Sequence, residues 1–180
     1  VTGSTVITLT VNDGNGNSST CTFNVNPTDN TPPSITCIVD QEVIFDENCQ
    51  FEISDYNGTP STSDNCSSSI SVTQSPASGS FISGLTSITL TADDGNGNTA
   101  TCSFMILPED LTNPTIACPA SFDVQFGSQG CSYLMSDLTS LVTADDNCAS
   151  LVTITQNPVI GTVVTDTLSV TFTADDGNGN

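Results

Sequence analysis

The chain repeats its own sequence, and this feature limits its possible folds more than any other. The segment ITLTVNDGNGNSSTCTF at 7–23 returns as ITLTADDGNGNTATCSF at 88–104, and VTFTADDGNGN begins a third time at Val170. The cysteines keep the same period. The first four, Cys21, Cys37, Cys49 and Cys66, recur 81 or 82 positions later as Cys102, Cys118, Cys131 and Cys148. Such a period predicts an array of small, similar domains.

The repeat divides the chain into three predicted parts. Residues 1–27 are expected to form the last hairpin of a preceding repeat, residues 28–108 a complete repeat (the first repeat), and residues 109–180 another repeat, truncated in its last hairpin (the second repeat). Because the sequence starts and stops within a repeat, we expect it to be one stretch of a longer polypeptide. The proline-bounded linkers at 27–33 and 108–114 favour extended, semi-rigid joints.

The pattern within one repeat predicts an all-β domain. In Ser87–Ala92, apolar and hydroxyl side chains alternate strictly, as in a half-buried strand, and the glycine-rich turn at 94–98 predicts a hairpin with the run that follows. Further strands are expected at 34–39, 41–45, 50–54, 70–74 and 81–83. Six or seven short strands in about 81 residues indicate tandem immunoglobulin-like β-sandwich repeats.

The composition excludes several function classes. The chain has no Lys, Arg or His and a net charge of −20, so it lacks the cations with which proteins bind nucleic acid or anionic membrane surfaces. It offers no Ser-His-Asp or Cys-His arrangement. Adjacent carboxylates such as Asp93 and Asp94 could suggest glycoside hydrolysis, but neighbours on a strand point to opposite faces. We therefore expect no enzyme, and no segment is apolar enough to insert into a membrane.

Several motifs together resemble the hyalin repeat (HYR) family. They are PPSITC, SDNC and SGLTSITLTADDGNGNTATCSF in the first repeat, and NPTIACPASFDV through ADDNC in the second. The resemblance implies an immunoglobulin-like fold in extracellular, multi-domain proteins associated with adhesion, including large repetitive bacterial surface proteins. The additional cysteines resemble the bacterial members. The family has no catalytic residues that could be transferred to this chain.

Eight cysteines at fixed places in the repeat indicate disulfides in an oxidising compartment. Strand parity places Cys37 and Cys102 on inward faces, and we predict a bridge between them. By elimination Cys49 pairs with Cys66 and Cys131 with Cys148, although a straight strand between such partners would hold the sulfurs too far apart. A rival connectivity, Cys21–Cys37 and Cys102–Cys118, would join consecutive domains.

Acidic and amide side chains are expected to gather at one end of each sandwich and bind calcium. The turn at 94–98 spaces oxygen ligands like half of an EF-hand loop, and good hairpin geometry is the alternative explanation of the same residues. The entering linker and a second loop should lie beside this turn. The candidate ligands are Asp29, Asn30, Asp64, Asn65, Asp93, Asp94 and Asn96, followed by Glu109, Asp110, Asp145, Asp146, Asp175 and Asp176.

These observations favour a structural and adhesive function: a stalk or filament segment of a large secreted or cell-surface protein. The expected partners are neighbouring repeats, identical chains in a filament, and a glycan or cell-surface partner. A module that binds glycan, mineral or ice through Thr-x-Thr faces stays an alternative, although two tyrosines and no tryptophan offer few platforms for sugar stacking.

Overall fold

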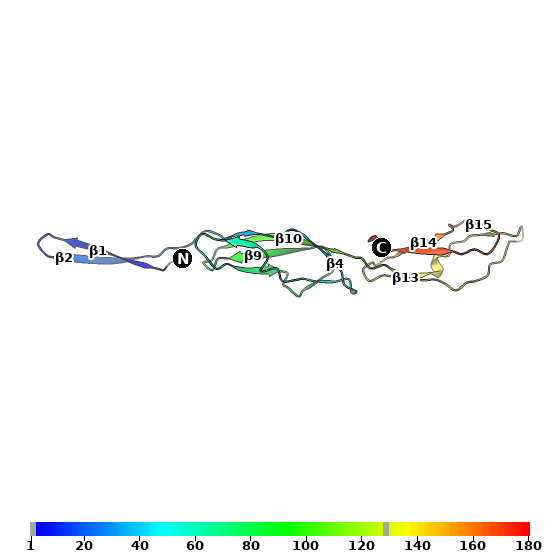
Figure 1. Cartoon of the computed structure of the whole chain (residues 1–180), viewed down its shortest axis with the longest axis horizontal. Helices are drawn as coiled ribbons and strands as arrows, with labels where there is room; N and C mark the ends of the chain where they lie inside the picture. The colour runs from blue at the N-terminus through cyan, green and yellow to red at the C-terminus, as the bar shows by residue number, and fades with distance from the viewer. Residues whose placement is uncertain (1–2, 128–129) are drawn as a thin grey trace. The chain divides into compact units, whose positions relative to one another are not determined.

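The computed structural model describes residues 3–127 and 130–180, and in these residues the chain is all-β (Figure 1). Its strands are short, and they pair in antiparallel ladders such as β1–β2 and β9–β10, as the alternating sequence predicts. One turn of 3-10 helix, η1 (Thr139–Leu141), is the single helical element in the described part. The predicted all-β class is confirmed, and the architecture is consistent with an immunoglobulin-like β-sandwich.

The chain opens with a hairpin of two eight-residue strands, β1 (Thr5–Asn12) and β2 (Ser18–Val25). Its turn is closed by a hydrogen bond from the N–H of Asp13 to the carbonyl of Asn17, 3.1 Å long. Apolar side chains on both strands are exposed, including Leu9 and Phe23. The hairpin has the sequence pattern of the later hairpin at 86–109, and its apolar side chains are exposed.

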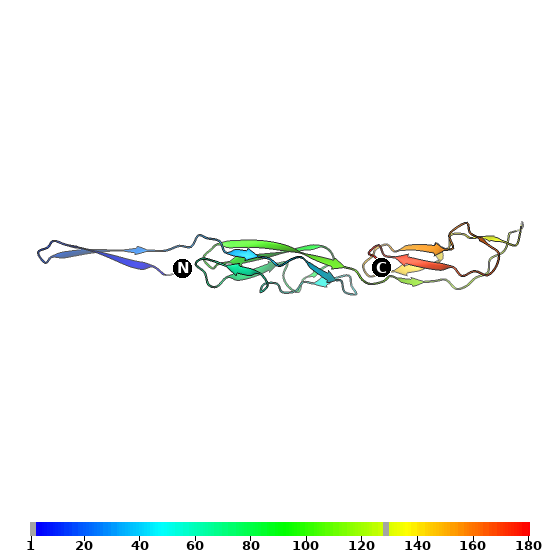
Figure 2. The same cartoon turned by 45° about the horizontal axis from the view of Figure 1, so that its top comes forward.

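The first repeat is built on a four-stranded sheet with the order β4-β10-β9-β7. β9 and β10 form its longest ladder and lie side by side in Figure 1 and again in the rotated view of Figure 2. The other strands form the pairs β3-β6 and β5-β8. The bounds are β3 (Ser34–Thr36), β4 (Gln41–Ile44), β5 (Phe51–Glu52), β6 (Ser61–Ser63), β7 (Ser71–Ser75), β8 (Phe81–Ile82), β9 (Thr86–Asp93) and β10 (Thr99–Glu109).

The alternation on β9 and β10 produces the core of the first repeat. The predicted inward side chains of β9 are buried, with Ile88, Leu90 and Ala92 all 0% exposed. On β10 the buried Phe104 meets the ring of Tyr56 edge to face, with 5.0 Å between the ring centroids. Tyr56 lies between β5 and β6, so the core is enclosed between the main sheet and that segment.

The second repeat reproduces the short pairs of the first. A glutamine within the equivalent strand of each repeat makes the same bond. The side-chain oxygen of Gln74 accepts the N–H of Tyr56, and that of Gln156 accepts the N–H of Leu138. The pairs are β11 (Thr115–Ala117) with β13 (Thr143–Asp145), β12 (Tyr133–Leu134) with β15 (Val163–Val164), and β14 (Thr153–Asn157) with β16 (Thr171–Asp175).

Contacts divide the chain into two compact units. One comprises Val1–Gln41, Glu52–Ser80 and Leu85–Ile106; the other comprises Glu42–Phe51, Phe81–Gly84 and Leu107–Asn180. The loop that carries Cys49 therefore belongs to the same unit as the whole second repeat. The repeat boundaries expected at 27/28 and 108/109 remain predictions.

Two disulfides are present in the described part of the chain. The first joins Cys37 to Cys102 with 5.7 Å between the Cα atoms, which is the bridge that strand parity predicted. The second joins Cys49 to Cys148 with 5.0 Å between the Cα atoms.

The second bridge corrects the predicted pairs Cys49–Cys66 and Cys131–Cys148, because it joins members of those two pairs. The rival pairing of Cys21 with Cys37 and Cys102 with Cys118 is also wrong. Cys21, Cys66, Cys118 and Cys131 are free and exposed. The physical reason lies in the segment between Cys49 and Cys66. This segment contains two strands, β5 and β6, and each pairs with a different partner. The two strands therefore carry the two cysteines apart.

Candidate metal centre

Three carboxylates from separate segments converge at one end of the first repeat. Asp29 comes from the linker, Asp64 from the loop after β6, and Asp94 from the turn after β9. One oxygen from each lies within 4.8 Å of the others. Asp29 and Asp94 are buried and Asp64 is half-buried. We call these residues the first triad.

The β9–β10 turn holds Asp94 by hydrogen bonds to its carboxylate. Its Oδ1 accepts the N–H of Asn96 and of Asn98, at 2.8 and 3.0 Å, and its Oδ2 accepts the side-chain amide of Asn98 at 2.6 Å. Gly95 and Gly97 allow this loop, with φ of 75° and 100°. Burial acts to raise the pKa of Asp94, but the hydrogen bonds from Asn98 and Asn96 outweigh it and lower the pKa.

The linker is tied directly to this turn. The side-chain amide of Asn98 donates to the carbonyl of Asp29 at 3.2 Å, and that of Asn96 donates to Oδ2 of Asp29 at 3.3 Å. Oδ1 of Asp29 accepts the N–H of Thr31 at 3.1 Å. The carboxylate of Asp29 is therefore fixed beside Asp94 by the turn's own amides.

The third member, Asp64, has one oxygen that nothing satisfies. Its Oδ1 accepts the N–H groups of Cys66 and Ser67, each at 2.8 Å. Its Oδ2 is buried and has no hydrogen-bond partner. Because a buried carboxylate oxygen without a partner is costly, this atom has the capacity to accept a further ligand.

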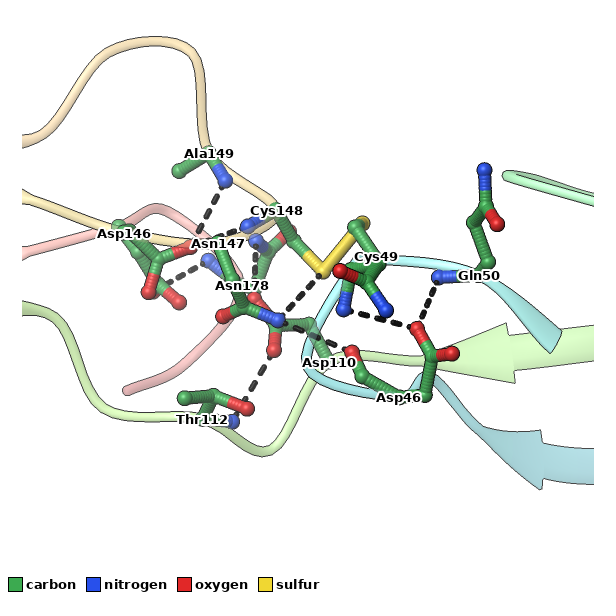
Figure 3. Close-up of a disulfide and its surroundings, with 12 residues drawn as sticks. Asp46, Cys49, Gln50, Asp110, Thr112, Asp146, Asn147, Cys148, Ala149 and Asn178 are labelled. Carbon is green, nitrogen blue, oxygen red and sulfur yellow. Dashed lines mark hydrogen bonds between the residues drawn. A yellow bond between two sulfur atoms is a disulfide. The ribbon is translucent and has the colours of Figure 1, made fainter.

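The second repeat contains a matching set, the second triad, formed by Asp110, Asp146 and Asp176. Figure 3 shows two of its members, Asp110 and Asp146. One oxygen from each again lies within 4.8 Å of the others. Oδ1 of Asp146 accepts two N–H groups at 2.8 Å, whereas its Oδ2 is buried without a partner.

The hydrogen bonds of the first triad also recur at the second. The side-chain amide of Asn178 donates to Oδ2 of Asp110 at 3.2 Å, and that of Asn180 donates to the carbonyl of Asp110 at 3.0 Å. Burial acts to raise the pKa of Asp176, and hydrogen bonds from Asn178 and Asn180 outweigh it, so that the pKa is lowered.

The remaining predicted ligands lie outside the two triads. Asp93 and Asp175 are exposed strand ends whose carboxylates accept the N–H of the glycine two residues on. They point away because neighbouring residues of a strand face opposite sides. Asn96 contacts the first triad as an amide donor to Asp29. Glu109, Asp145, Asn30 and Asn65 are exposed and belong to neither group of carboxylates.

Each triad collects three carboxylates in a chain that has no cationic side chain to neutralise them. Carboxylate oxygens are ligands for hard divalent cations, and calcium accepts six to eight oxygens in flexible geometry. Three side chains supply part of such a set, and backbone carbonyls and water can complete it. The residues present therefore fit calcium.

The Cys49–Cys148 bridge lies directly beside the second triad (Figure 3). Cys148 follows Asp146 by two residues, and its N–H donates to the Asp146 carboxylate. On the other side, Asp46 organises the turn that carries Cys49, since its Oδ1 accepts the N–H groups of Asn48 and Gln50 at 2.8 and 2.9 Å. The side-chain amide of Asn147 joins the two loops by donating to the carbonyl of Asp46 at 3.2 Å.

The sequence analysis predicted a bridge between the correct two positions of the repeat, but it placed both cysteines in the same repeat. The bridge in fact joins one repeat to the next. The predicted partner of Cys49 was Cys66, and the actual partner, Cys148, is the counterpart of Cys66 one repeat later, 82 residues further along. The repeat period itself offered this pairing, because any bridge within a repeat has a counterpart that reaches the next repeat.

Comparison with known proteins finds one protein family and two similar proteins. Residues 28–107 match the family model described as the HYR domain. Hyalin from Lytechinus variegatus is 34% identical over 185 residues, covering 99% of this chain and 34% of hyalin. Hyalin from Strongylocentrotus purpuratus is 29% identical over 181 residues, covering 93% of this chain and 15% of hyalin. The chain thus spans about a third and about a seventh of the length of these curated relatives.

Within residues 3–127 and 130–180, no helix has the length and apolar character needed to cross a membrane.

Proposed function

Residues 28–107 are an HYR domain, and on this basis we propose that the chain is a calcium-binding stalk segment of an extracellular adhesion protein. Each repeat contributes length and a rigid joint, and the adhesive contact is made elsewhere or by the array as a whole. The similarity to two hyalins along nearly the whole chain supports an extracellular, adhesion-type module. The stalk role is our extension of that similarity.

The observation that carries the proposal is the pair of unpartnered oxygens. Oδ2 of Asp64 and Oδ2 of Asp146 are equivalent atoms, 82 residues apart, and both are buried without a hydrogen bond. Each belongs to a group of three carboxylates. Solvation alone would account for exposed acidic side chains, but it does not account for a buried oxygen without a partner on a residue of each group.

Calcium at a triad would link the linker to two loops of the same repeat. In the first triad the ion would join Asp29 of the linker to Asp64 and Asp94 of the sandwich. The amides of Asn96 and Asn98 already hold the linker close, and the ion would neutralise the charges that these bonds bring together. Binding would therefore stiffen the entry into each repeat and stabilise the repeat.

Titration of the 180-residue chain with calcium, followed by calorimetry, tests this proposal. We expect two binding sites per chain. Asp64→Asn should abolish the first site and Asp146→Asn the second, because each replaces a carboxylate with an amide of the same shape. The matched control is Asp93→Asn, which removes the same charge from an exposed residue outside the triads and should leave two sites.

The result that opposes the proposal is equally specific. If Asp64→Asn and Asp93→Asn reduce calcium binding equally, the ion responds to the overall charge of −20 and the triads are not sites. Raising the salt concentration separates the two cases, since salt screens exposed charges far more than a buried site.

A further inference from the structure

Asn147 follows a member of the second triad directly, and only one of its two polar side-chain atoms has a partner. The amide nitrogen donates to the carbonyl of Asp46 at 3.2 Å and lies 3.4 Å from the sulfur of Cys148. The amide oxygen, Oδ1, is buried and has no hydrogen-bond partner within the described residues. An amide oxygen can accept two bonds, so leaving it buried with none is costly.

The contacts of the nitrogen fix the direction of this oxygen. A backbone carbonyl only accepts hydrogen bonds, so the atom of Asn147 that faces the carbonyl of Asp46 must be the nitrogen. The carboxamide is planar and its two polar atoms point apart, so Oδ1 is directed away from Asp46. Figure 3 shows the Asn147 oxygen on the side of the Asp110 and Asp146 carboxylates. Asn147 therefore presents an unused oxygen to the second triad.

The preceding residue, Asp146, has the same deficit. Its Oδ2 is buried without a partner, while its Oδ1 accepts the N–H groups of Cys148 and Ala149. Two adjacent side chains thus each leave one buried oxygen unsatisfied. A charged carboxylate and an amide oxygen both only accept hydrogen bonds, so neither atom can satisfy the other. A cation is a partner that satisfies both at once.

We propose that Oδ1 of Asn147 is a fourth protein ligand of a calcium ion held by the second triad. The inference rests on the calcium binding proposed above and adds one neutral oxygen to the three carboxylates. Calcium accepts asparagine side-chain oxygens as well as carboxylates. Asn147 then holds the ion through its oxygen and the carbonyl of Asp46 through its nitrogen, which ties the site to the turn that carries Cys49.

The test isolates the second site in an Asp64→Asn background, in which the first triad has lost a carboxylate. Asn147→Ala should weaken calcium binding by about ten-fold in calorimetry, because water replaces a fixed oxygen ligand. Asn147→Asp supplies a charged oxygen at the same position and should bind at least as tightly as the background. The matched control is Asn65→Ala, the same change at the exposed asparagine one repeat earlier, which should leave the affinity of the second site unchanged.

The number of bound water molecules distinguishes a ligand from a residue that only positions the loop. Europium(III) also prefers oxygen ligands, and its luminescence lifetimes in H2O and D2O report how many water molecules the bound ion keeps. Asn147→Ala should raise this number by about one, because the ion fills the position that the side chain leaves. Asn147→Asp should return the number to that of the background.

Peptide mapping checks that each variant keeps its fold around the site. Cleavage before aspartate places Cys49 and Cys148 in different fragments, so the bridge between them appears as a linked pair of peptides. We expect this pair in the background and in every Asn147 variant. A change in water number with the bridge intact then belongs to the side chain of Asn147 and not to loss of the loop.

Two results would overturn the inference and leave the calcium site in place. One is an Asn147→Ala variant with the affinity and the water number of the background. The other is weaker binding in both Asn147→Ala and Asn147→Asp without any added water, which would mean that the amide acts only through its bond to Asp46. A background that binds neither calcium nor europium would refute the second site itself, and the fourth ligand with it.

Discussion

At the scale of single residues, the asparagines of the glycine-rich turn explain why carboxylates can be buried in this chain. Asp94 and Asp176 are buried without a cationic neighbour, and each is surrounded by backbone N–H groups and asparagine amides. These donors favour the charged carboxylate over the neutral acid, because only the charged form accepts all of the bonds. The same donors therefore keep the carboxylates of Asp94 and Asp176 in the charged form that a cation would bind.

The lowered pKa values of Asp94 and Asp176 predict a loss of stability in acid. Their folded-state pKa lies below the ordinary value of 3.8, so in the window beneath that value the unfolded chain binds protons that the folded chain does not. Stability is therefore present above pH 4 and decreases as the pH falls through the folded-state pKa. Urea unfolding in chelator between pH 5 and pH 2.5 measures this slope, and Asp94→Asn/Asp176→Asn should flatten it. An equal slope in that variant would contradict the assignment.

At the scale of elements, the alternation of apolar and polar side chains predicted the strands that form the core. It did not predict strands whose sequences lack this alternation. The strand predicted at Ser87–Ala92 is confirmed as part of β9. Every second side chain in it is apolar, and β9 buries those side chains. The segment expected as one strand at 34–39 is a strand only over β3, because the chain leaves the pairing with β6 after Thr36. β6 itself, with the sequence STS, has no apolar alternation from which to predict it.

The candidate metal centre was also predicted only in part from the sequence. Topology predicted that linker, loop and turn would meet, because sandwich loops cluster at the ends of the sheets. Which member of each adjacent acidic pair would point inward depends on where the strand ends, and sequence does not fix this to one residue. Asp94 and Asp176 are buried, and their neighbours Asp93 and Asp175 are exposed.

Packing of β10 against the Tyr56 segment predicts a strong effect of one ring. Phe104 is 3% exposed and contacts Tyr56 edge to face, so Phe104→Ala should lower the free energy of unfolding of the first repeat by about 3–5 kcal/mol. The matched control is Phe81→Ala, because Phe81 is 58% exposed and its loss should change the free energy by less than about 0.5 kcal/mol. Denaturant titration of both variants measures the difference. Equal effects would mean that the core is placed wrongly.

At the scale of the whole molecule, the second triad and the Cys49–Cys148 disulfide lie at the same place, the entry into the second repeat. The second triad lies within two residues of Cys148, whose bridge reaches the loop of Cys49 in the first repeat. With calcium bound as proposed above, the second triad would add an ionic element to this covalent one, and neither depends on cationic side chains, of which the chain has none.

The measurement that tests the central claim most directly is thermal unfolding of the oxidised chain in calcium and in chelator. A ligand that binds only the folded state stabilises it by RT ln(1 + [L]/Kd), about 2.7 kcal/mol at a hundred times Kd. We predict a higher Tm in calcium for the natural chain, and the same Tm in both conditions for Asp64→Asn/Asp146→Asn. A natural chain whose Tm is unchanged by calcium, or a double variant that responds as the natural chain does, would contradict the account.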